Sequence, residues 1–393
     1  MNLLLLINIS LLATMLLCLL ALWRFRWRDY SLPARWSETA ESTEQPAISI
    51  IIPALDQGDY LAEYLPIFLQ QNYPSFEIIV VDEASTDDTP DVLKRLSAED
   101  KRLRYLSVPR SARHIELTKL ALTLGVRSAR FPWVVFTRAD CQPASPDWLS
   151  RLAEQFAPGV EMVGGYANYL NDETRQARRP IFERLRLQLR LARAARSGRP
   201  VYADPCNLAV KKAFFMAQEG FANSLLLPFG EEELFVDAYA TPENFRQTWH
   251  PDATICQQLP ARRLLADERI YTAEIANRSS RRRRLYAARE AWASCFFFLF
   301  FLLTLTYIGE RIFYILQQSV YFIQDLATDL PFLLLLITAI ILPIRLMRKA
   351  TRALGERRFG GMLIAYAWLQ PLRNRLTYLR RLHRSESFVR PSL

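Results

Sequence analysis

The chain is poor in the residues that build metal centres and disulfide frameworks. Its 393 residues include five cysteines and three histidines. The cysteines are scattered and lack the paired spacing of metal-binding modules. The histidines, His114, His250 and His383, are far apart in the sequence. These shortages argue against a cysteine-based metal module and a histidine triad, and they fit a main domain in a reducing compartment.

Acidic residues are in the minority: 40 Asp and Glu stand against 50 Lys and Arg, for a formal charge of +10. Such an excess is compatible with nucleic-acid binding, with a membrane surface or simply with solubility. The basic clusters lie beside apolar runs, which favours the membrane surface and indicates no nucleic-acid partner. They are Arg24, Arg26 and Arg28; residues 281–284; and Arg345, Arg348, Lys349 and Arg352.

Long uncharged apolar runs occur near both ends of the chain and are missing from its middle. Residues 3–23 are long enough to cross a bilayer as a helix. A cleaved signal peptide needs a basic start and a small-residue cleavage site, but here the basic residues follow the run, so a retained anchor is predicted. Residues 293–308 and 330–344 predict two more spans, with borders left open because 312–323 is also apolar.

The distribution of arginine around these spans predicts their orientation. The stretch 309–329 between the second and third spans is poor in positive charge, whereas arginine clusters flank the other sides. By the positive-inside rule, the central domain and the C-terminus are expected in the cytoplasm, at an inner membrane, and the 309–329 loop outside.

We therefore predict five segments along the chain. They are an N-terminal transmembrane anchor (1–28), a linker (29–46), a cytoplasmic α/β domain (47–290), two transmembrane helices (291–346) and a cytoplasmic helical tail (347–393). In the tail, Leu369, Leu372, Leu376 and Leu379 fall on one helical face. This pattern predicts a helix in the membrane interface or, as an alternative, a helix packed on the central domain.

Short apolar runs alternate with helical patterns in the central domain. Strands are expected at residues 48–54, 78–81, 103–108 and 133–136, and helices at 61–69, 89–99 and 112–130. This alternation predicts βαβ units and a mainly parallel sheet, whose ligands bind beyond the carboxyl ends of the strands. Asp82, Glu83 and Asp140 stand at such ends. Several carboxylates there favour a polar ligand, and a phosphate would need a divalent cation beside them.

Five stretches of this domain stand in a recognisable order: IIIPALDQGDYL, FEIIVVDEASTDDT, VVFTRADCQPASPDWL, DPCNLAVKKAFF and GFANSLLLPFGEEELF. Together they resemble family 2 glycosyltransferases, over residues 47–240. The resemblance implies the GT-A fold, a Rossmann-like nucleotide-sugar domain with a mostly parallel sheet. The flanking apolar helices are similar to those of membrane-bound bacterial members.

The resemblance also implies roles for matching positions. Asp140 would hold Mg²⁺ or Mn²⁺ on the donor diphosphate, and Asn207 lies in the stretch near the acceptor. Glu232, with Glu231 beside it, matches the base that removes the acceptor proton in an inverting transfer. The nucleotide-binding positions implied are Pro53, Leu55, Asp56, Asp82, Ser85 and Lys119.

Four departures from the family pattern bear on this chemistry. Arg138 stands where the Asp-x-Asp motif has its first carboxylate; it would either contact the diphosphate directly or weaken metal binding by repulsion. Glu231-Glu232-Glu233 replaces an Asp-rich catalytic stretch, which places each carboxylate one methylene further out. Glu83-Ala84 replaces the usual Asp-Gly. No Gln-x-x-Arg-Trp motif follows, which argues against a processive polymerase.

Three functional interpretations remain open. The first is a hexosyl-type glycosyltransferase that moves a sugar from a nucleotide diphosphate to a membrane-proximal, lipid-linked or glycan acceptor. The second is a catalytically impaired scaffold or nucleotide-binding subunit of the same fold. The third is phosphoryl or nucleotidyl transfer. The arginine-rich segment 173–199 adds a helix that contacts the bilayer or an acidic lipid acceptor, or else packs on the domain.

Overall fold

A computed structural model describes most of the chain. The described residues are 2–30, 45–109, 117–170, 177–196, 200, 202–224, 227, 230–261, 265, 275, 279–317, 323–356 and 359, and eight positions between 362 and 379. The chain divides into two compact units, Met1–Leu32 with Arg284–Leu379 and Pro33–Arg283 with Arg380–Leu393. The predicted linker lies almost entirely outside the described residues.

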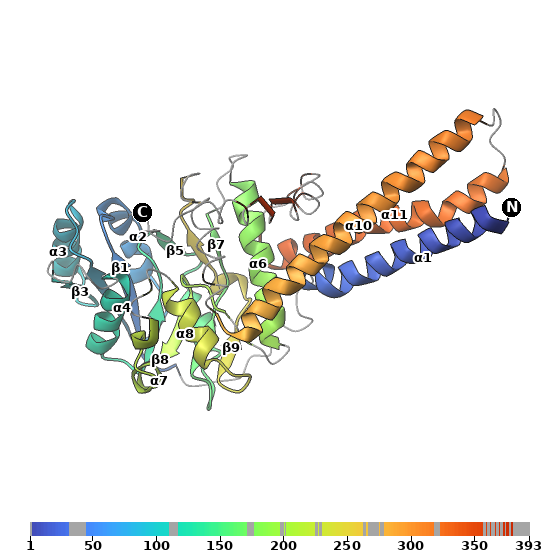
Figure 1. Cartoon of the computed structure of the whole chain (residues 1–393). Coiled ribbons are helices and arrows are strands. Elements are labelled where there is room, and N and C mark those ends of the chain that lie inside the picture. Colours follow the sequence, from blue (N-terminus) through green and yellow to red (C-terminus); the bar gives the residue numbers. More distant parts are fainter. Residues whose placement is uncertain are drawn as a thin grey trace. The chain divides into compact units, whose positions relative to one another are not determined.

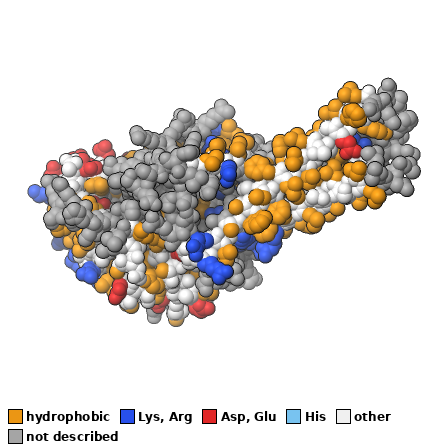
Figure 2. Space-filling model, viewed as in Figure 1, with side chains coloured by type: hydrophobic (Ala, Val, Ile, Leu, Met, Phe, Trp, Pro, Cys, Tyr) orange, Lys and Arg blue, Asp and Glu red, His pale blue; other side chains and the backbone are white. Residues whose placement is uncertain are grey.

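The first unit is helical and confirms three apolar segments long enough to cross a membrane. It contains α1 (Asn2–Phe25), the short helix η1 (Trp27–Tyr30), α10 (Arg281–Gln317, from Arg284 on) and α11 (Ile323–Ala353) (Figure 1). The candidate spans within the helices are Leu6–Phe25, Ala291–Tyr314 and Asp329–Ala353. Figure 2 shows many hydrophobic side chains on the face of these helices that is in view, as expected of a surface that faces lipid.

The connection between the last two spans is shorter than the loop predicted for residues 309–329. Most of it is helical, because α10 continues to Gln317 and α11 begins at Ile323. An ion pair between Arg311 Nε and Asp329 Oδ1, 2.5 Å apart, joins the two helices there. Tyr307 also hydrogen-bonds Asp329, and its ring stacks on Phe332 with centroids 3.9 Å apart. A single charge near the end of a membrane span is costly, whereas the paired charges of Arg311 and Asp329 are tolerated there. The two helices can therefore extend past their apolar runs.

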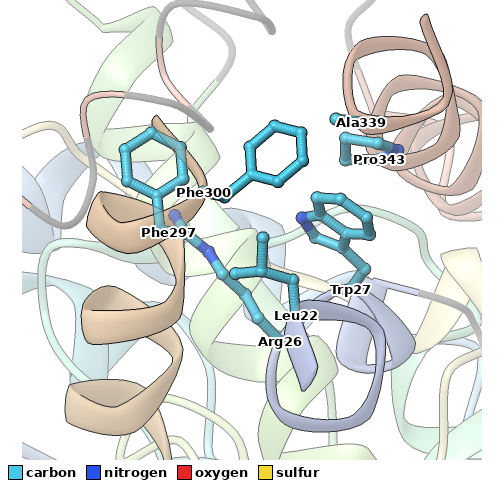
Figure 3. A pocket seen from close by; sticks show the side chains of 7 residues that line it. All are labelled: Leu22, Arg26, Trp27, Phe297, Phe300, Ala339 and Pro343. Atoms are coloured by element: carbon cyan, nitrogen blue, oxygen red, sulfur yellow. The ribbon is translucent and has the colours of Figure 1, made fainter. Parts of the chain in front are cut away.

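Helices α1, η1, α10 and α11 line a small cavity near the end of α1 (Figure 3). Apart from the buried Arg26, its walls are apolar. The Arg26 Nε donates a hydrogen bond to the Tyr30 hydroxyl, 3.0 Å away, which ties α1 to η1. The lining residues are Leu22, Arg26, Trp27, Phe297, Phe300, Ala339 and Pro343.

In the predicted tail, the described positions of the leucine face are helical. Leu369, Leu372, Leu376 and Leu379 are between 39% and 53% exposed, so they form an apolar stripe that the described residues do not cover. Its location in a membrane interface stays a prediction.

The second unit is an α/β domain built on a seven-stranded sheet of order β3-β2-β1-β4-β8-β6-β9. Its first four strands are parallel, which confirms the predicted mostly parallel sheet. Strand β8 pairs antiparallel with both β4 and β6. The bounds are β1 (Ile48–Ala54), β2 (Phe76–Asp82), β3 (Leu103–Ser107), β4 (Trp133–Phe136), β6 (Met162–Gly164), β8 (Leu208–Lys211) and β9 (Phe245–Gln247).

Helices cover both faces of this sheet because its buried strands are rich in β-branched residues and are apolar on each side. One core packs α2, α3 and α5 on one face, and a second packs α4, α7 and α8 on the other (Figure 1). The bounds are α2 (Gly58–Leu69), α3 (Thr89–Glu99), α4 (Leu117–Ser128), α5 (Trp148–Ala153), α7 (Lys212–Ala217) and α8 (Glu231–Tyr239). The residues just before α4 in the predicted helix 112–130 lie outside the described ranges.

A second, three-stranded sheet of order β5-β10-β7 lies next to the loop that follows β4. Its strands are β5 (Cys141–Pro143), β7 (Ala167–Tyr169) and β10 (Ile255–Gln257). Two single-turn helices, η2 (Ala222–Ser224) and η3 (Pro251–Ala253), belong to the loops. The arginine-rich segment forms α6 (Arg178–Arg196), which buries Phe182, Leu185 and Leu189 against the domain. That face confirms the packed-helix alternative.

Candidate active site

The loops that follow β1 and β2 are joined by hydrogen bonds at the carboxyl edge of the sheet. The Asp56 amide donates to the Ser85 hydroxyl over 3.0 Å, and Asp56 Oδ1 accepts from the Thr86 amide at 2.7 Å. Asp82 Oδ1 accepts from the Ser85 amide at 3.0 Å. The structure thus brings together Asp56, Asp82 and Ser85, three of the predicted nucleotide positions. Pro53 lies in β1, and Leu55, which directly follows that strand, is half-buried.

Ala84 in this loop has a backbone conformation that favours glycine. Its φ is +64°, in the left-handed region, which costs a residue with a Cβ roughly 1–2 kcal/mol. The resemblance implies glycine at this position, so the alanine found here has a structural cost. The adjacent Glu83 ties the loop to α4, because its carboxylate accepts a hydrogen bond from Thr118 at 3.1 Å.

Arg138 and Glu232 form a buried ion pair at the end of β4. Arg138 Nη2 lies 2.9 Å from Glu232 Oε2, and their side chains are 13% and 0% exposed. Among the described residues, Arg138 Nη1 and Glu232 Oε1 have no hydrogen-bond partner although both are buried. Buried polar atoms are nearly always satisfied, so an unpaired donor and acceptor side by side mark a place for a polar ligand.

The three glutamates Glu231, Glu232 and Glu233 form the first turn of α8 and are all buried. Gly230, with a φ of +73°, turns the chain into this helix. Burial raises the pKa of Glu232 to about 8, even though the charge of Arg138 opposes the rise. Burial, followed by the charge of Glu231, raises the pKa of Glu233 to about 7. A carboxylate with a pKa near neutrality is suited to proton transfer.

Asp140 lies between the two sheets and is 6% exposed. Its Oδ2 accepts a hydrogen bond from Gln257 Nε2 at 2.9 Å, and burial raises the pKa of Asp140. Gln257 Oε1 in turn accepts from Arg184 Nη1 at 2.5 Å. Sequence reasoning missed Gln257, whose short strand has no motif. The arginine-rich segment was expected either to contact a lipid or acceptor or to pack on the domain, and Arg184 packs on the domain, paired with Asp204.

Lys119 is completely buried in α4 and contacts main-chain carbonyls. Its ammonium donates to the carbonyl oxygens of Ser224 and Leu227, the latter at 2.6 Å. These residues belong to the loop that precedes α8, so Lys119 fixes the approach to the glutamates. A contact of Lys119 with a nucleotide stays a prediction.

Asn207 is buried at the centre of the domain and holds three segments together. Its Oδ1 accepts from Trp148 Nε1 at 3.1 Å, and its Nδ2 donates to the carbonyls of Tyr166 and Ala253, both at 2.8 Å. A Cβ at Gly165 would lie 2.2 Å from Asn207 Nδ2, so only glycine fits beside it. The structure thus gives Asn207 a supporting role, and its predicted acceptor contact stays a prediction.

The residues around Asp140 fit a divalent cation with few protein ligands. Mg²⁺ is commonly held by one or two carboxylates together with substrate phosphates, and Mn²⁺ shares its preference for carboxylate ligands. Asp140 supplies one buried carboxylate whose raised pKa reflects a poorly solvated charge. The positive charge of Arg138 is balanced by Glu232, so it does not stand alone against a cation.

Comparison with known proteins shows which family the domain is similar to. Residues 49–215 match the model of glycosyl transferase family 2. An uncharacterized glycosyltransferase of Haemophilus influenzae is 31% identical over 108 residues, which cover 27% of this chain and 32% of that protein. The dolichyl N-acetyl-alpha-D-glucosaminyl phosphate 3-beta-D-2,3-diacetamido-2,3-dideoxy-beta-D-glucuronosyltransferase of Methanococcus voltae is 24% identical over 188 residues, which cover 46% of this chain and 51% of that protein. Each match therefore spans only a third to a half of the relative.

A solved structure extends the likeness to the fold of nearly the whole chain. The mannosyltransferase PcManGT of Pyrobaculum calidifontis, in complex with GDP-Man and Mn²⁺, aligns with 94% of this chain and 98% of its own. The TM-score is 0.53 at 19% sequence identity, so the likeness supports the predicted GT-A fold.

Proposed function

Because residues 49–215 belong to glycosyl transferase family 2, we propose that the chain transfers a sugar, with inversion, from a nucleotide-diphosphate donor to a membrane-proximal, lipid-linked acceptor at the cytoplasmic face of an inner membrane. The three apolar helices support a membrane location. The Arg138–Glu232 pair carries the proposal, since its free Nη1 and Oε1 match the two partners that a transfer brings, an anionic diphosphate and an acceptor hydroxyl.

The donor's nucleoside would bind at the loops after β1 and β2. Asp82 is the hydrogen-bond acceptor for the base, and Pro53, Leu55, Asp56 and Ser85 line the pocket. The hydrogen bonds that join Ser85 to Asp56 and to Asp82 already fix these loops, so little order has to be gained on binding. Arg138 directs its Nη1 toward the diphosphate, for which a guanidinium is a good geometric match.

Glu232 acts as the base, with Glu231 beside it. Its Oε1 accepts the proton of the acceptor hydroxyl, while its Oε2 stays bound to Arg138. The ion pair fixes the direction of the carboxylate, which is required for a proton transfer over about 2.6–3.2 Å. Attack from the side opposite the leaving diphosphate inverts the anomeric centre.

Asp140 would hold a Mg²⁺ or Mn²⁺ ion on the diphosphate. When bound, such an ion stabilises the charge that develops on the departing nucleoside diphosphate. The mannosyltransferase of similar fold was solved with Mn²⁺, which supports this choice.

The scaffold interpretation keeps one supporting observation. The Glu232 carboxylate is already held by Arg138, so one of its two oxygens is not available to an acceptor hydroxyl. Nucleotide binding without sugar transfer would favour that interpretation.

A screen of nucleotide sugars for hydrolysis and transfer, run on the full chain in detergent, tests the proposal. We expect one donor to be turned over by the wild type, with kcat about 10²–10⁴-fold lower in Glu232→Gln and unchanged donor binding. Glu161→Gln is the control, because Glu161 pairs with Lys211 at the surface. Wild-type protein that binds no uridine or guanosine diphosphate, with or without Mn²⁺, would rule the proposal out.

A further inference from the structure

A continuous chain of hydrogen bonds connects Asp140 to the interior of α6. Gln257 Nε2 donates to Asp140 Oδ2 at 2.9 Å, and Gln257 Oε1 accepts from Arg184 Nη1 at 2.5 Å. The register of the small sheet explains the placement, because Gln257 in β10 pairs with Cys141 of β5 and with Tyr169 of β7. Gln257 is therefore next to Asp140 in space although 117 residues separate them.

The Arg184 guanidinium at the far end of this chain is held on several sides. Its Nε and Nη2 donate to Asp204 Oδ2 and Oδ1 at 3.1 and 2.8 Å, the two-pronged geometry of strong arginine–carboxylate pairs. It also lies over the ring of Tyr169, with 4.7 Å from Cζ to the centroid.

Asp204 is itself immobilised by its neighbours. It accepts a hydrogen bond from the Cys206 amide at 3.0 Å and another from Gln188 of α6. The Arg184 and Asp204 side chains are 9% and 2% exposed, so water offers little competition for these bonds.

Arg184 determines which way the Gln257 amide faces. A guanidinium has only donors, whereas an amide has an oxygen at one end and an NH₂ group at the other. The oxygen of Gln257 must therefore face Arg184, which leaves its NH₂ group toward Asp140. If the amide were reversed, its oxygen would face the Asp140 carboxylate and repel it.

We propose that Arg184 and Gln257 are positioning residues that fix the Asp140 carboxylate toward the donor diphosphate and its cation. Neither touches the reacting atoms; they act through Asp140. The proposal rests on the function proposed above, and it gives α6 a task at the donor site.

The test compares two kinds of nucleotide on the purified full chain. Uridine and guanosine monophosphates without cation report the base pocket at Asp82. The corresponding diphosphates with Mn²⁺ report the region of Asp140 in addition. A purely structural role would weaken both kinds of binding together, whereas a positioning role weakens the second alone.

Gln257→Met is the main variant, because it breaks both bonds of the amide and leaves the Arg184–Asp204 pair in place. We expect Mn²⁺-dependent diphosphate binding about 10–100-fold weaker, the usual effect of removing a group that orients a metal ligand, with monophosphate binding unchanged. Arg184→Lys, which keeps a positive charge and a donor beside Asp204, should weaken diphosphate binding less than Gln257→Met does. Arg179→Met on the same helix is the control, because Arg179 pairs with Glu183 and not with Asp204.

Two results would overturn the proposal. If Gln257→Met binds the diphosphates as tightly as the wild type does, Asp140 needs no support from Gln257. Equal weakening of monophosphate and diphosphate would show a structural role. Wild-type protein that binds neither nucleotide would remove the proposed function itself, and the positioning role with it. That outcome differs from the other two because the wild type fails as well.

Discussion

The Arg138 guanidinium lies 2.9 Å from the Glu232 carboxylate and so joins the loop after β4 to the first turn of α8. Arg138 stands in place of the first carboxylate of the Asp-x-Asp motif, and its positive charge is therefore neutralised within the protein. The two departures from the family pattern, Arg138 and the glutamate run, compensate each other in charge.

Arg138→Met should strongly destabilise the α/β domain. The change leaves Glu232 buried without its partner, and breaking a buried ion pair on one side costs about 3–5 kcal/mol. Thermal unfolding measures the effect, and Arg138→Lys should lose less. Arg130→Met is the control, because Arg130 is 65% exposed and lies 3.9 Å from Glu77, so it should change little. Equal unfolding temperatures for Arg138→Met and wild type would contradict the burial of the pair.

Activity should rise with pH up to about 8 and then level off. Glu232 accepts a proton only when it is ionised, and burial raises its pKa to about 8. Below that value the ionised fraction falls about tenfold per pH unit. The profile of kcat/KM for the donor found in the screen measures this, and a limb centred near the unperturbed value of 4.5 would contradict it.

Stability should change in the opposite direction over the same range. The folded pKa of Glu232 is raised above the unfolded value of 4.5, so the unfolded chain releases this proton first as pH increases. The contribution of Glu232 to stability is fully present below pH 4.5 and is lost as pH rises to about 8. The unfolding temperature should fall across that window, and less so in Glu232→Gln. Glu233, with a pKa of about 7, contributes to the same fall.

Ala84→Gly should stabilise the α/β domain. It relieves the strain of the positive φ at this position, which is worth roughly 1–2 kcal/mol. The entropic cost of glycine is smaller, so the net gain is about 0.5–1 kcal/mol. The expected rise in unfolding temperature is about 1–4 °C. Ala98→Gly, at an exposed helical position in α3, should lower the unfolding temperature instead. A decrease for Ala84→Gly would show that the loop does not adopt this conformation.

Asp329→Asn should loosen the pairing of α10 and α11. Arg311 then keeps its charge without the carboxylate that lies 2.5 Å away, in a region where unpaired charges are costly. We expect a lower unfolding temperature in detergent, recovered in part by the exchanged pair Arg311→Asp with Asp329→Arg. If the exchanged pair is no better than Asp329→Asn, the two side chains do not act through mutual attraction.

The strands were predictable because their signal is local. Residues 48–54 and 133–136 are continuous apolar runs, and the structure gives strands with those bounds. The site was predictable only in part, because motif order locates residues without showing their partners. Arg138 and Glu232 are 94 residues apart in the sequence, and nothing in either motif indicates that the two charges meet.

Arg184 shows why a helical pattern could not identify the partner of a residue in the arginine-rich segment. Sequence spacing places Phe182, Leu185 and Leu189 on one face. In α6 the buried face is wider and includes Ile181 and Gln188. Arg184, three residues after Ile181 and four before Gln188, therefore lies on that face. Its partner Asp204 comes from a distant loop, so no helical period could reveal it.

The three hydrogen bonds of Asn207 have a consequence for how the domain opens. Because one side chain connects Trp148, Tyr166 and Ala253, none of these segments can separate without breaking contacts to the others. Local opening at one of them is therefore suppressed, and the amide protons of β7 and β10 should exchange with solvent only when the whole domain unfolds. Loops with few such ties, such as the one around Gly159, should exchange at a much lower free energy.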